Sequence, residues 1–234
     1  MHDTGIDAAQ EPADDRRSRP RSDGTQRAHH DAIYTLARAA ELHDEDTGNH
    51  VIRIRLIVQR LARWMGFSEP EAAALGHDAM LHDVGKLTTP QDVLKKPGAL
   101  TDEERIVMEA HTVQGERLLS RRPTMSRAAR IARNHHECWD GSGYPDGRRG
   151  EDIPLEARIT AVADVLDALV ADRCYKKSWS YREAVEEVCA LSGTKLDPQI
   201  IEALRRCDAA GELDDIFRPS AYWKEKRDGE ADGT

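Results

Sequence analysis

Helix-start signals recur along most of this sequence, and no segment shows the alternation of apolar and polar residues that a half-buried strand requires. Capping boxes, in which Ser or Thr is followed three residues later by Glu, open predicted helices at Ser68, Thr101 and Ser180. Apolar residues recur at intervals of three and four from Val51 to Met65, as on the buried face of a helix. The sequence therefore predicts an all-α fold, a single helical bundle.

Composition predicts where the folded part begins and ends. Residues 1–28 are rich in Asp, Arg, Ser, Pro and Gly and nearly free of large apolar residues, so they cannot bury enough surface to offset the entropy cost of ordering. Residues 224–234 have a similar composition. We therefore expect a disordered tail over 1–28, with His29 and His30 solvated beside it. One domain is expected over 29–223, followed by a flexible tail over 224–234.

Net charge and cysteine spacing restrict the partners and the compartment. The chain has 34 Lys and Arg against 43 Asp and Glu, a formal net charge of −9, which opposes binding along a polyanion such as DNA. It contains no run of about 18 apolar residues and no apolar segment near the N-terminus typical of a secretory signal. The four cysteines are widely spaced, without a CxxC pair. We therefore expect a cytoplasmic protein that neither binds DNA nor inserts into membranes.

Histidine and acidic residues occupy settings that are hard to justify by packing alone. His82 and Asp83 are expected to end a largely apolar helix, where an unpaired carboxylate would cost several kcal/mol. Asp164 and Asp167 interrupt another apolar helix, as expected of a metal ligand and a residue that supports one. Each residue alone could make an ordinary hydrogen bond or surface pair. The full set is Asp46, His50, His82, Asp83, His111, His135, His136, Asp164 and Asp167.

Together these residues suit a metal site. Imidazole and carboxylate ligands without thiolate are typical of iron, manganese, zinc or magnesium, here at two or more neighbouring sites. Two metal ions about 3.5–4 Å apart lower the pKa of a bridging water and clamp a phosphoryl oxygen, which is the arrangement for phosphodiester hydrolysis. A second His-Asp pair begins at His77, five residues before His82. Five residues rotate a helix by about 500°, so we expect His77 to point away from the site.

Four segments resemble the HD-GYP domain, a branch of the HD phosphohydrolase superfamily. They are "HD…GK" from His82, "HHECWDGSGYP" from His135, "ADVLDAL" and "DRCYKKSWS", and the resemblance runs from about Tyr34 to Phe217. It implies a helical bundle with two or three divalent metal ions in its core, iron or manganese foremost, with zinc, nickel or magnesium as alternatives. It also implies hydrolysis of the bacterial second messenger cyclic di-GMP to pGpG, or on to GMP, through a metal-bridging hydroxide, which lowers the level of the messenger.

The resemblance also implies a role for each matching residue. The core metal ligands are His82, Asp83, His111, His135, His136 and Asp164, with Asp83 bridging two ions. Asp46 and His50 match the pair that supports an additional ion in trinuclear members. Lys86 matches the lysine near the scissile phosphate, so Asp83 and Lys86 are the expected catalytic residues. The residues that match a dinucleotide-binding set are Lys86, Tyr144, Arg173 and Lys176.

The sequence departs from the family pattern at two of these places. Asp46 stands where trinuclear members commonly carry the longer glutamate, so we expect a weak or empty third metal site. From this we predict pGpG as the main product, with slow conversion to GMP or none. Cys174 replaces the proline usual in "DRPYK", next to Arg173.

Two other functions stay open at this point. One is hydrolysis of a different cyclic dinucleotide by the same metal chemistry. The other is a non-catalytic module that senses cyclic di-GMP or contacts a diguanylate cyclase or another regulatory protein through the GYP loop. The sequence also leaves open whether the protein forms a homodimer.

Overall fold

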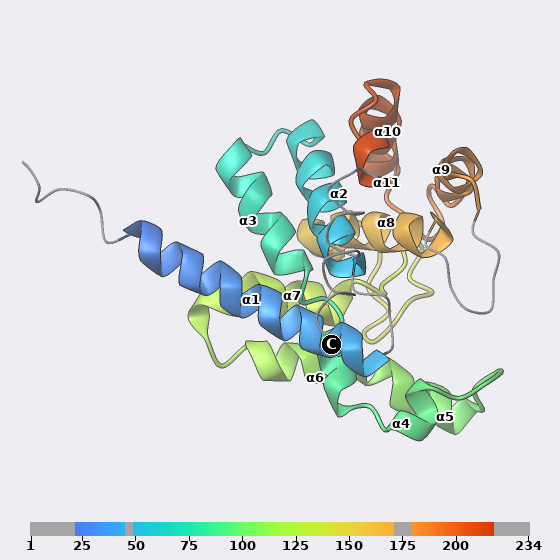
Figure 1. Cartoon of the computed structure of the whole chain (residues 1–234). Coiled ribbons are helices and arrows are strands. Elements are labelled where there is room, and N and C mark those ends of the chain that lie inside the picture. Colours follow the sequence, from blue (N-terminus) through green and yellow to red (C-terminus); the bar gives the residue numbers. More distant parts are fainter. Residues whose placement is uncertain (1–21, 45–48, 171–178, 218–234) are drawn as a thin grey trace, which may run out of the picture.

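The computed structural model describes residues 22–44, 49–170 and 179–217 of the 234-residue chain. In these ranges the backbone forms α-helices and short 3-10 helices and no β-strand, which confirms the predicted all-α class. The elements are α1 (Ser22–Asp44), α2 (His50–Trp64), α3 (Glu69–Ala79), η1 (Val84–Thr88), α4 (Gln91–Leu94), α5 (Asp102–Glu109), α6 (His111–Leu119), η2 (Pro123–Met125), α7 (Ser126–Asn134), η3 (Gly150–Asp152), α8 (Leu155–Val170), α9 (Tyr181–Ala190), α10 (Pro198–Ala209) and α11 (Asp214–Phe217). Figure 1 shows how they are arranged.

Local capping explains where several helices begin. The predicted capping boxes at Ser68, Thr101 and Ser180 are present and open α3, α5 and α9. The side chain of Asp197 accepts a hydrogen bond from the backbone N–H of Gln199 at the start of α10. Each cap pairs a backbone N–H that the helix itself leaves without a partner.

Two buried apolar clusters hold the bundle together. The larger includes Ile54, Leu75 and Leu166, which come from α2, α3 and α8. The smaller includes Ile33 of α1 and Leu81 of the turn after α3. Full burial of such a side chain contributes about 1.5–3 kcal/mol. Because α2, α3, α7 and α8 supply residues to these clusters, the core fixes the helix ends that carry the histidines.

The amino-terminal helix begins earlier than composition predicted. Helix α1 starts at Ser22, before the expected boundary at residue 28, and lies across one side of the bundle (Figure 1). The ring of His30 stacks on that of His77, with centroids 3.8 Å apart, so His30 is in contact with α3. The ring of His77 thus faces α1, but the helical rotation expected between His77 and His82 does not apply, because α3 ends at Ala79. Residues 1–21 and 218–234, which include most of the expected N-terminal tail and all of the expected C-terminal tail, lie outside the described residues.

The prediction that the third helix reaches Asp83 is wrong. Helix α3 ends at Ala79, and the next residues form turns in which backbone N–H groups bond to carbonyls three residues back, as from His82 to Ala79. This tighter winding turns the chain away from the axis of α3 and into η1. The turn places His82 and Asp83 at the point where α2, α6, α7 and α8 meet.

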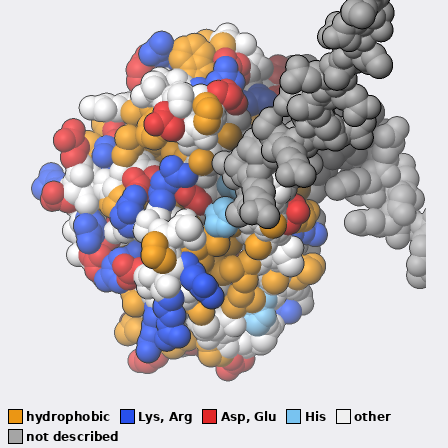
Figure 2. Space-filling model, turned by 90° about the vertical axis from the view of Figure 1, so that its left-hand side faces the viewer, with side chains coloured by type: hydrophobic (Ala, Val, Ile, Leu, Met, Phe, Trp, Pro, Cys, Tyr) orange, Lys and Arg blue, Asp and Glu red, His pale blue; other side chains and the backbone are white. Residues whose placement is uncertain are grey.

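Within the ranges described above, no helix is both long and apolar enough to cross a bilayer. On the face shown in Figure 2, Lys and Arg side chains are interspersed with Asp and Glu around apolar areas.

Candidate metal centre

Helix ends and turns bring the candidate ligands together from distant parts of the sequence. His50 begins α2, His82 and Asp83 lie in the turn after α3, His111 begins α6, His135 and His136 follow α7, and Asp164 lies within α8. Most of these side chains are buried. Side chains at helix termini can converge on one point because each helix is anchored by its own apolar face.

The ligand atoms form two groups that share one carboxylate. Within each group the atoms lie within 4.8 Å of one another, and the groups are Asp83, His111, His135 and His136, and His50, His82 and Asp83. Oδ1 of Asp83 lies 3.3 Å from Nε2 of His111 and 3.6 Å from Nε2 of His135. Oδ2 lies 3.3 Å from Nε2 of His82. The two oxygens of Asp83 therefore face different groups, which is the geometry of a carboxylate that can bridge two ions.

Hydrogen bonds on the far side of the rings orient these imidazoles. The Nδ1 atoms face backbone carbonyls: His82 to Ala79 at 3.0 Å, His111 to Met108 at 2.6 Å and His135 to Ala132 at 3.0 Å. A carbonyl can only accept, so we assign the proton to Nδ1. The lone pair of Nε2 then points into the cluster, as in histidines that bind metals.

Several atoms at the centre lack a hydrogen bond, and a metal ion would satisfy them. Among the described residues, Oδ1 of Asp83 and the Nε2 atoms of His111 and His135 are buried without a hydrogen-bond partner. Leaving such an atom unpaired costs about 1–3 kcal/mol. The donor set, imidazole and carboxylate without thiolate, is one that first-row divalent metals accept. The residues present therefore fit a divalent metal centre.

Burial and neighbouring charges shift the pKa values of several residues at the centre. Burial lowers the pKa of His82, but Asp83 and Asp164 more than compensate and raise it to about 9. Burial raises the pKa of the Asp83 carboxyl, yet Lys86 and His82 hold it well below its usual range. Burial and the adjacent His135 hold the pKa of His136 well below its ordinary value, so this imidazole stays neutral. Without a metal ion, a proton on His82 supplies the positive charge that the carboxylates attract.

Asp167 supports His50 from behind. Its Oδ2 atom lies 2.7 Å from Nδ1 of His50 and 2.9 Å from Nη2 of Arg53. Burial raises the pKa of Asp167, but hydrogen bonds from these two residues outweigh burial and keep the carboxyl ionised. The opposite nitrogen of His50, Nε2, lies 3.7 Å from Oδ1 of Asp164. Asp167 thus lies behind His50, a candidate ligand, and Asp164 lies beside it.

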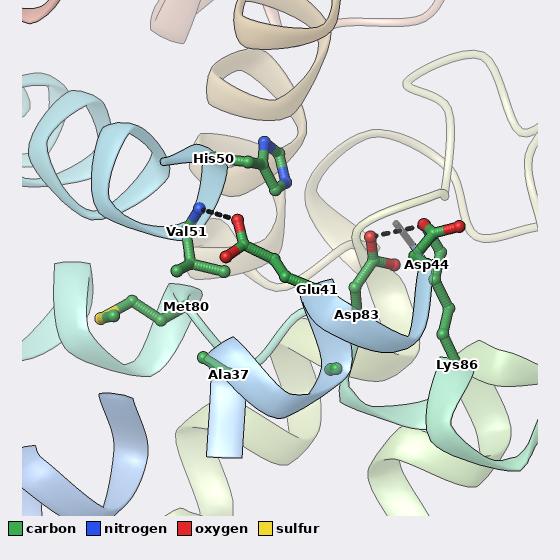
Figure 3. Close-up of a pocket in the computed structure, with 9 residues that line it drawn as sticks. Ala37, Glu41, Asp44, His50, Val51, Met80, Asp83 and Lys86 are labelled. Carbon is green, nitrogen blue, oxygen red and sulfur yellow. Dashed lines mark hydrogen bonds and ion pairs between the residues drawn. The ribbon is translucent and has the colours of Figure 1, made fainter. Parts of the chain in front are cut away.

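Close packing of the adjacent Gly85 against α6 keeps Lys86 at the centre. A Cβ atom added to Gly85 would lie 1.8 Å from the backbone oxygen of His111, so only glycine lets η1 approach α6 this closely. Nζ of Lys86 lies 2.9 Å from Oδ2 of Asp83 and 2.8 Å from Oδ2 of Asp44. Figure 3 shows these three charged side chains on one side of a pocket.

Asp44 did not emerge from the sequence as a site residue. The sequence offered no local signal for it, because its partner Lys86 lies 42 residues further along the chain.

The loop after His136 brings a tyrosine to the edge of the centre. The ring centroids of Tyr144 and His136 lie 4.8 Å apart, with an angle of 31° between the ring planes. The loop turns sharply at Gly143, where an added Cβ would lie 2.3 Å from the backbone nitrogen of Cys138. Burial raises the pKa of Tyr144, and Asp83 raises it further, so its hydroxyl stays protonated and can donate.

A buried glutamate that the sequence analysis missed fixes the shape of this loop. Glu137 accepts backbone hydrogen bonds from Asp146 at 2.8 Å and Arg148 at 3.0 Å. Arg133 of α7 holds the same segment through two hydrogen bonds to the Asp146 carboxylate. The position of Glu137, directly after the two histidines that follow α7, was the available clue, because a carboxylate buried there needs hydrogen-bond donors.

Some expected site residues cannot be placed. Asp46, Arg173 and Lys176 lie outside the described residues, as does Cys174. Their expected contributions to a third ion and to substrate binding stay predictions.

A helical bundle whose helix ends carry a buried His-Asp cluster defines the class of HD-type metal-binding domains. The HD domain family matches residues 34–200, and the chain belongs to this family. This confirms the family resemblance found in the sequence.

Relatives of known name are similar over most of the chain. It is 44% identical over 174 residues to "3'3'-cGAMP-specific phosphodiesterase 2" of Vibrio cholerae, covering 74% of this chain and 33% of the relative. It is 44% identical over 178 residues to "Cyclic di-GMP phosphodiesterase response regulator RpfG" of Xanthomonas campestris, covering 75% and 47%. It is 40% identical over 190 residues to "Cyclic di-GMP phosphodiesterase" of Thermotoga maritima, covering 80% and 51%. The chain therefore spans only part of the length of each of these relatives.

Solved structures support the fold. A cyclic GMP-AMP specific phosphodiesterase of V. cholerae, V-cGAP3, superposes with a TM-score of 0.63 at 21% identity, covering 84% of this chain and 52% of the other. The HDG"Y"P protein Bd1817 of Bdellovibrio bacteriovorus superposes with a TM-score of 0.54 at 19% identity, covering 77% and 62%. At these identities the likeness concerns the fold alone.

Proposed function

We propose that this chain is a metal-dependent phosphodiesterase that hydrolyses cyclic di-GMP to pGpG, with slow conversion to GMP or none. The observation that carries the proposal is the placement of Asp83, whose two oxygens face two buried histidine groups. Relatives that are 40% and 44% identical are named cyclic di-GMP phosphodiesterases, which supports the choice of substrate.

The proposed centre holds two divalent ions, with iron or manganese as the first candidates. One group consists of Asp83, His111, His135 and His136, and the other of His82, Asp83 and Asp164. His50, which lies next to His82 and Asp83, is proposed to hold a third ion together with Asp46. When bound, such ions activate a water molecule and neutralise charge on a phosphoryl oxygen. The backbone carbonyls behind the histidines keep the Nε2 atoms aimed at the ions, so little reorganisation is needed during the reaction.

Residues at the rim are proposed to hold the substrate. Cyclic di-GMP carries two phosphate charges, and a chain with a net charge of −9 needs a local positive region to attract it. Lys86 supplies an ammonium group beside Asp83, and it is proposed to stabilise charge on the scissile phosphate. Tyr144 offers a ring for stacking and a hydroxyl donor. Arg173 and Lys176 are proposed to bind the remaining phosphate or a guanine edge.

The predicted product follows from Asp46. An aspartate is one methylene shorter than the glutamate of trinuclear members, and a metal-bound carboxylate must reach about 2.0–2.2 Å from its ion. We propose a weak third site, which leaves the first cut intact and slows the second. The second cut must accommodate a linear dinucleotide with an additional terminal charge, which a third cation would neutralise.

A second candidate substrate is 3'3'-cGAMP, because one relative at 44% identity is named for that specificity. It differs from cyclic di-GMP in one base, whereas the proposed metal ions would contact only phosphate. The choice between the two substrates therefore depends on residues at the rim, where Tyr144 is the described candidate.

The test is a turnover assay on anaerobically purified protein reconstituted with iron or manganese, using cyclic di-GMP and 3'3'-cGAMP separately. Chromatography of the products distinguishes pGpG from GMP. The proposal expects pGpG from cyclic di-GMP at a higher kcat/KM than for 3'3'-cGAMP, and no turnover after chelation. A preference for 3'3'-cGAMP would establish the second candidate. Binding of cyclic di-GMP by metal-replete protein without turnover would show a sensing module instead.

A further inference from the structure

The last residue of α1 contacts the lysine of the metal centre. The carboxylate of Asp44 lies 2.8 Å from Nζ of Lys86, and the same ammonium lies 2.9 Å from Asp83. About a quarter of the Asp44 side chain and a fifth of the Lys86 side chain are exposed, at 27% and 20%, so the pair lies at the mouth of the centre. Lys86 is thus shared between a candidate metal ligand and a residue of another helix.

The position of Asp44 is unfavourable unless a cation is nearby. The C-terminal end of a helix carries partial negative charge, which opposes a carboxylate there. The other carboxylate in this part of α1, Glu41, is already engaged by the backbone N–H of Val51 and by Arg38. Figure 3 shows Glu41 directed at α2 and Asp44 directed at Lys86. The two carboxylates, one turn apart, therefore have different roles: Glu41 joins two helices, and Asp44 faces the centre.

Metal binding would change what holds Lys86. Bound ions would neutralise part of the charge of Asp83 and would repel the ammonium. Asp44 belongs to neither ligand group of the described residues, so bound ions would leave its contact with Lys86 in place. We propose that Asp44 is a positioning residue that holds the Lys86 ammonium at the mouth of the metal-loaded centre, where it meets the phosphate of the substrate. This inference rests on the proposed function and assigns a role to a residue outside the ligand set.

Whether Asp44→Asn strengthens or weakens substrate binding distinguishes positioning of Lys86 from direct repulsion of the substrate by Asp44. Asp44 is an anion close to the expected place of an anionic substrate. If it acted only through space, Asp44→Asn would strengthen substrate binding. If it positions Lys86, Asp44→Asn weakens binding, because the ammonium is no longer held where the phosphate lies.

The experiment measures binding of a non-hydrolysable phosphorothioate analogue of cyclic di-GMP to metal-loaded protein, together with KM and kcat for cyclic di-GMP. The variants are Asp44→Asn, Lys86→Met and the double variant. We expect Asp44→Asn to weaken analogue binding and raise KM by roughly tenfold, the loss of one charge-assisted hydrogen bond. In the Lys86→Met background the same substitution should leave analogue binding unchanged or strengthen it. Asp44→Glu, which keeps the charge, should restore part of the loss.

A matched control lies on the same helix. Asp31 of α1 is exposed, so Asp31→Asn removes the same charge away from the centre and should leave KM and melting temperature unchanged. An equal loss of binding from Asp44→Asn with and without Lys86 would overturn the inference. So would a loss accompanied by a lower melting temperature than that of Asp31→Asn and by reduced metal content, since these indicate a structural role.

A measurement on Lys86 itself tests the role of Asp44 independently of which dinucleotide the protein hydrolyses. Acylation of Lys86 by an amine-reactive reagent, followed by mass spectrometry of metal-loaded protein, reports how firmly the ammonium is held. Asp44→Asn should accelerate modification of Lys86 several-fold relative to Asp31→Asn, whichever dinucleotide is hydrolysed. An unchanged rate contradicts positioning by Asp44, whereas absent turnover of cyclic di-GMP by the wild type contradicts only the proposed function.

Discussion

The Oδ1 atom of Asp83 and the Nε2 atom of His111 lie 3.3 Å apart, both buried, and neither has a hydrogen-bond partner among the described residues. A folded protein seldom buries two such atoms side by side without a third group to satisfy them. Since His111 is oriented by the carbonyl of Met108, its free nitrogen is directed at this place by the fold itself. The relationship predicts how the centre responds to pH, to substitution and to metal removal.

Metal affinity is expected to rise with pH. The metal-free centre holds a proton on His82, whose pKa is raised from the ordinary 6.5 to about 9. Metal binding requires the neutral imidazole and must displace this proton. The apparent Kd for Mn²⁺, measured by calorimetry in buffers of different ionisation enthalpy, should fall between pH 6.5 and 9 with proton release. A Kd independent of pH over this range would show that His82 is not a ligand.

The raised pKa of His82 also predicts that the metal-free and metal-loaded proteins differ in how their stability depends on pH. A raised pKa of His82 stabilises the metal-free fold fully below pH 6.5, and this contribution is lost as the pH rises through about 9. The melting temperature of metal-free protein should therefore decrease over that interval relative to the metal-loaded protein. Parallel melting curves for the two forms would contradict the assignment.

Loss of the support behind His50 should weaken metal binding without unfolding the chain. Asp167→Asn keeps the volume of the side chain but removes the charge that faces His50 and Arg53. Such a supporting residue typically contributes about 10–100-fold to metal affinity. Metal titration of the variant should show this loss in one class of sites, with the helical circular dichroism unchanged. Equal affinity in variant and wild type would mean that His50 is not a ligand.

The close approach of η1 to α6 should be intolerant of a methyl group. Gly85→Ala places a Cβ 1.8 Å from the His111 carbonyl oxygen, so η1 must shift, and we expect a loss of about 1–3 kcal/mol in the free energy of unfolding. Gly24→Ala is the matched control, because nothing lies within 4 Å of the added atom and the site is helical. Chemical denaturation of both variants checks the prediction. A Gly85→Ala variant as stable as the control contradicts the packing seen here.

The sequence predicted where helices start better than where they end and how they connect. Capping boxes such as that at Ser68 are local, so helix starts could be read directly. The end of α3 at Ala79 could not, because the turn that follows is set by packing of Gly85 against α6, a contact distant in sequence. Asp44 was missed for the same reason, because its partner Lys86 becomes a neighbour only in the folded chain. The partners of Glu137, at Asp146 and Arg148, lie closer in sequence, but they reach it only through the fold of the loop.

Product analysis tests the expectation for Asp46. The wild type should convert cyclic di-GMP to pGpG with slow formation of GMP or none, whereas Asp46→Glu should raise the metal content per chain or accelerate GMP formation. The longer side chain reaches an ion that aspartate does not. Rapid formation of GMP by the wild type, with three metal ions per chain, would show that Asp46 serves as well as glutamate.

The measurement that tests the central claim most directly is the metal content and turnover of Asp83→Ala, determined on the same preparation by mass spectrometry of metals and by the cyclic di-GMP assay. Because this carboxylate belongs to both ligand groups, its loss should reduce metal loading and abolish hydrolysis together. Asp31→Asn serves as the control and should retain both. An Asp83→Ala protein with normal metal content and full activity would contradict the account.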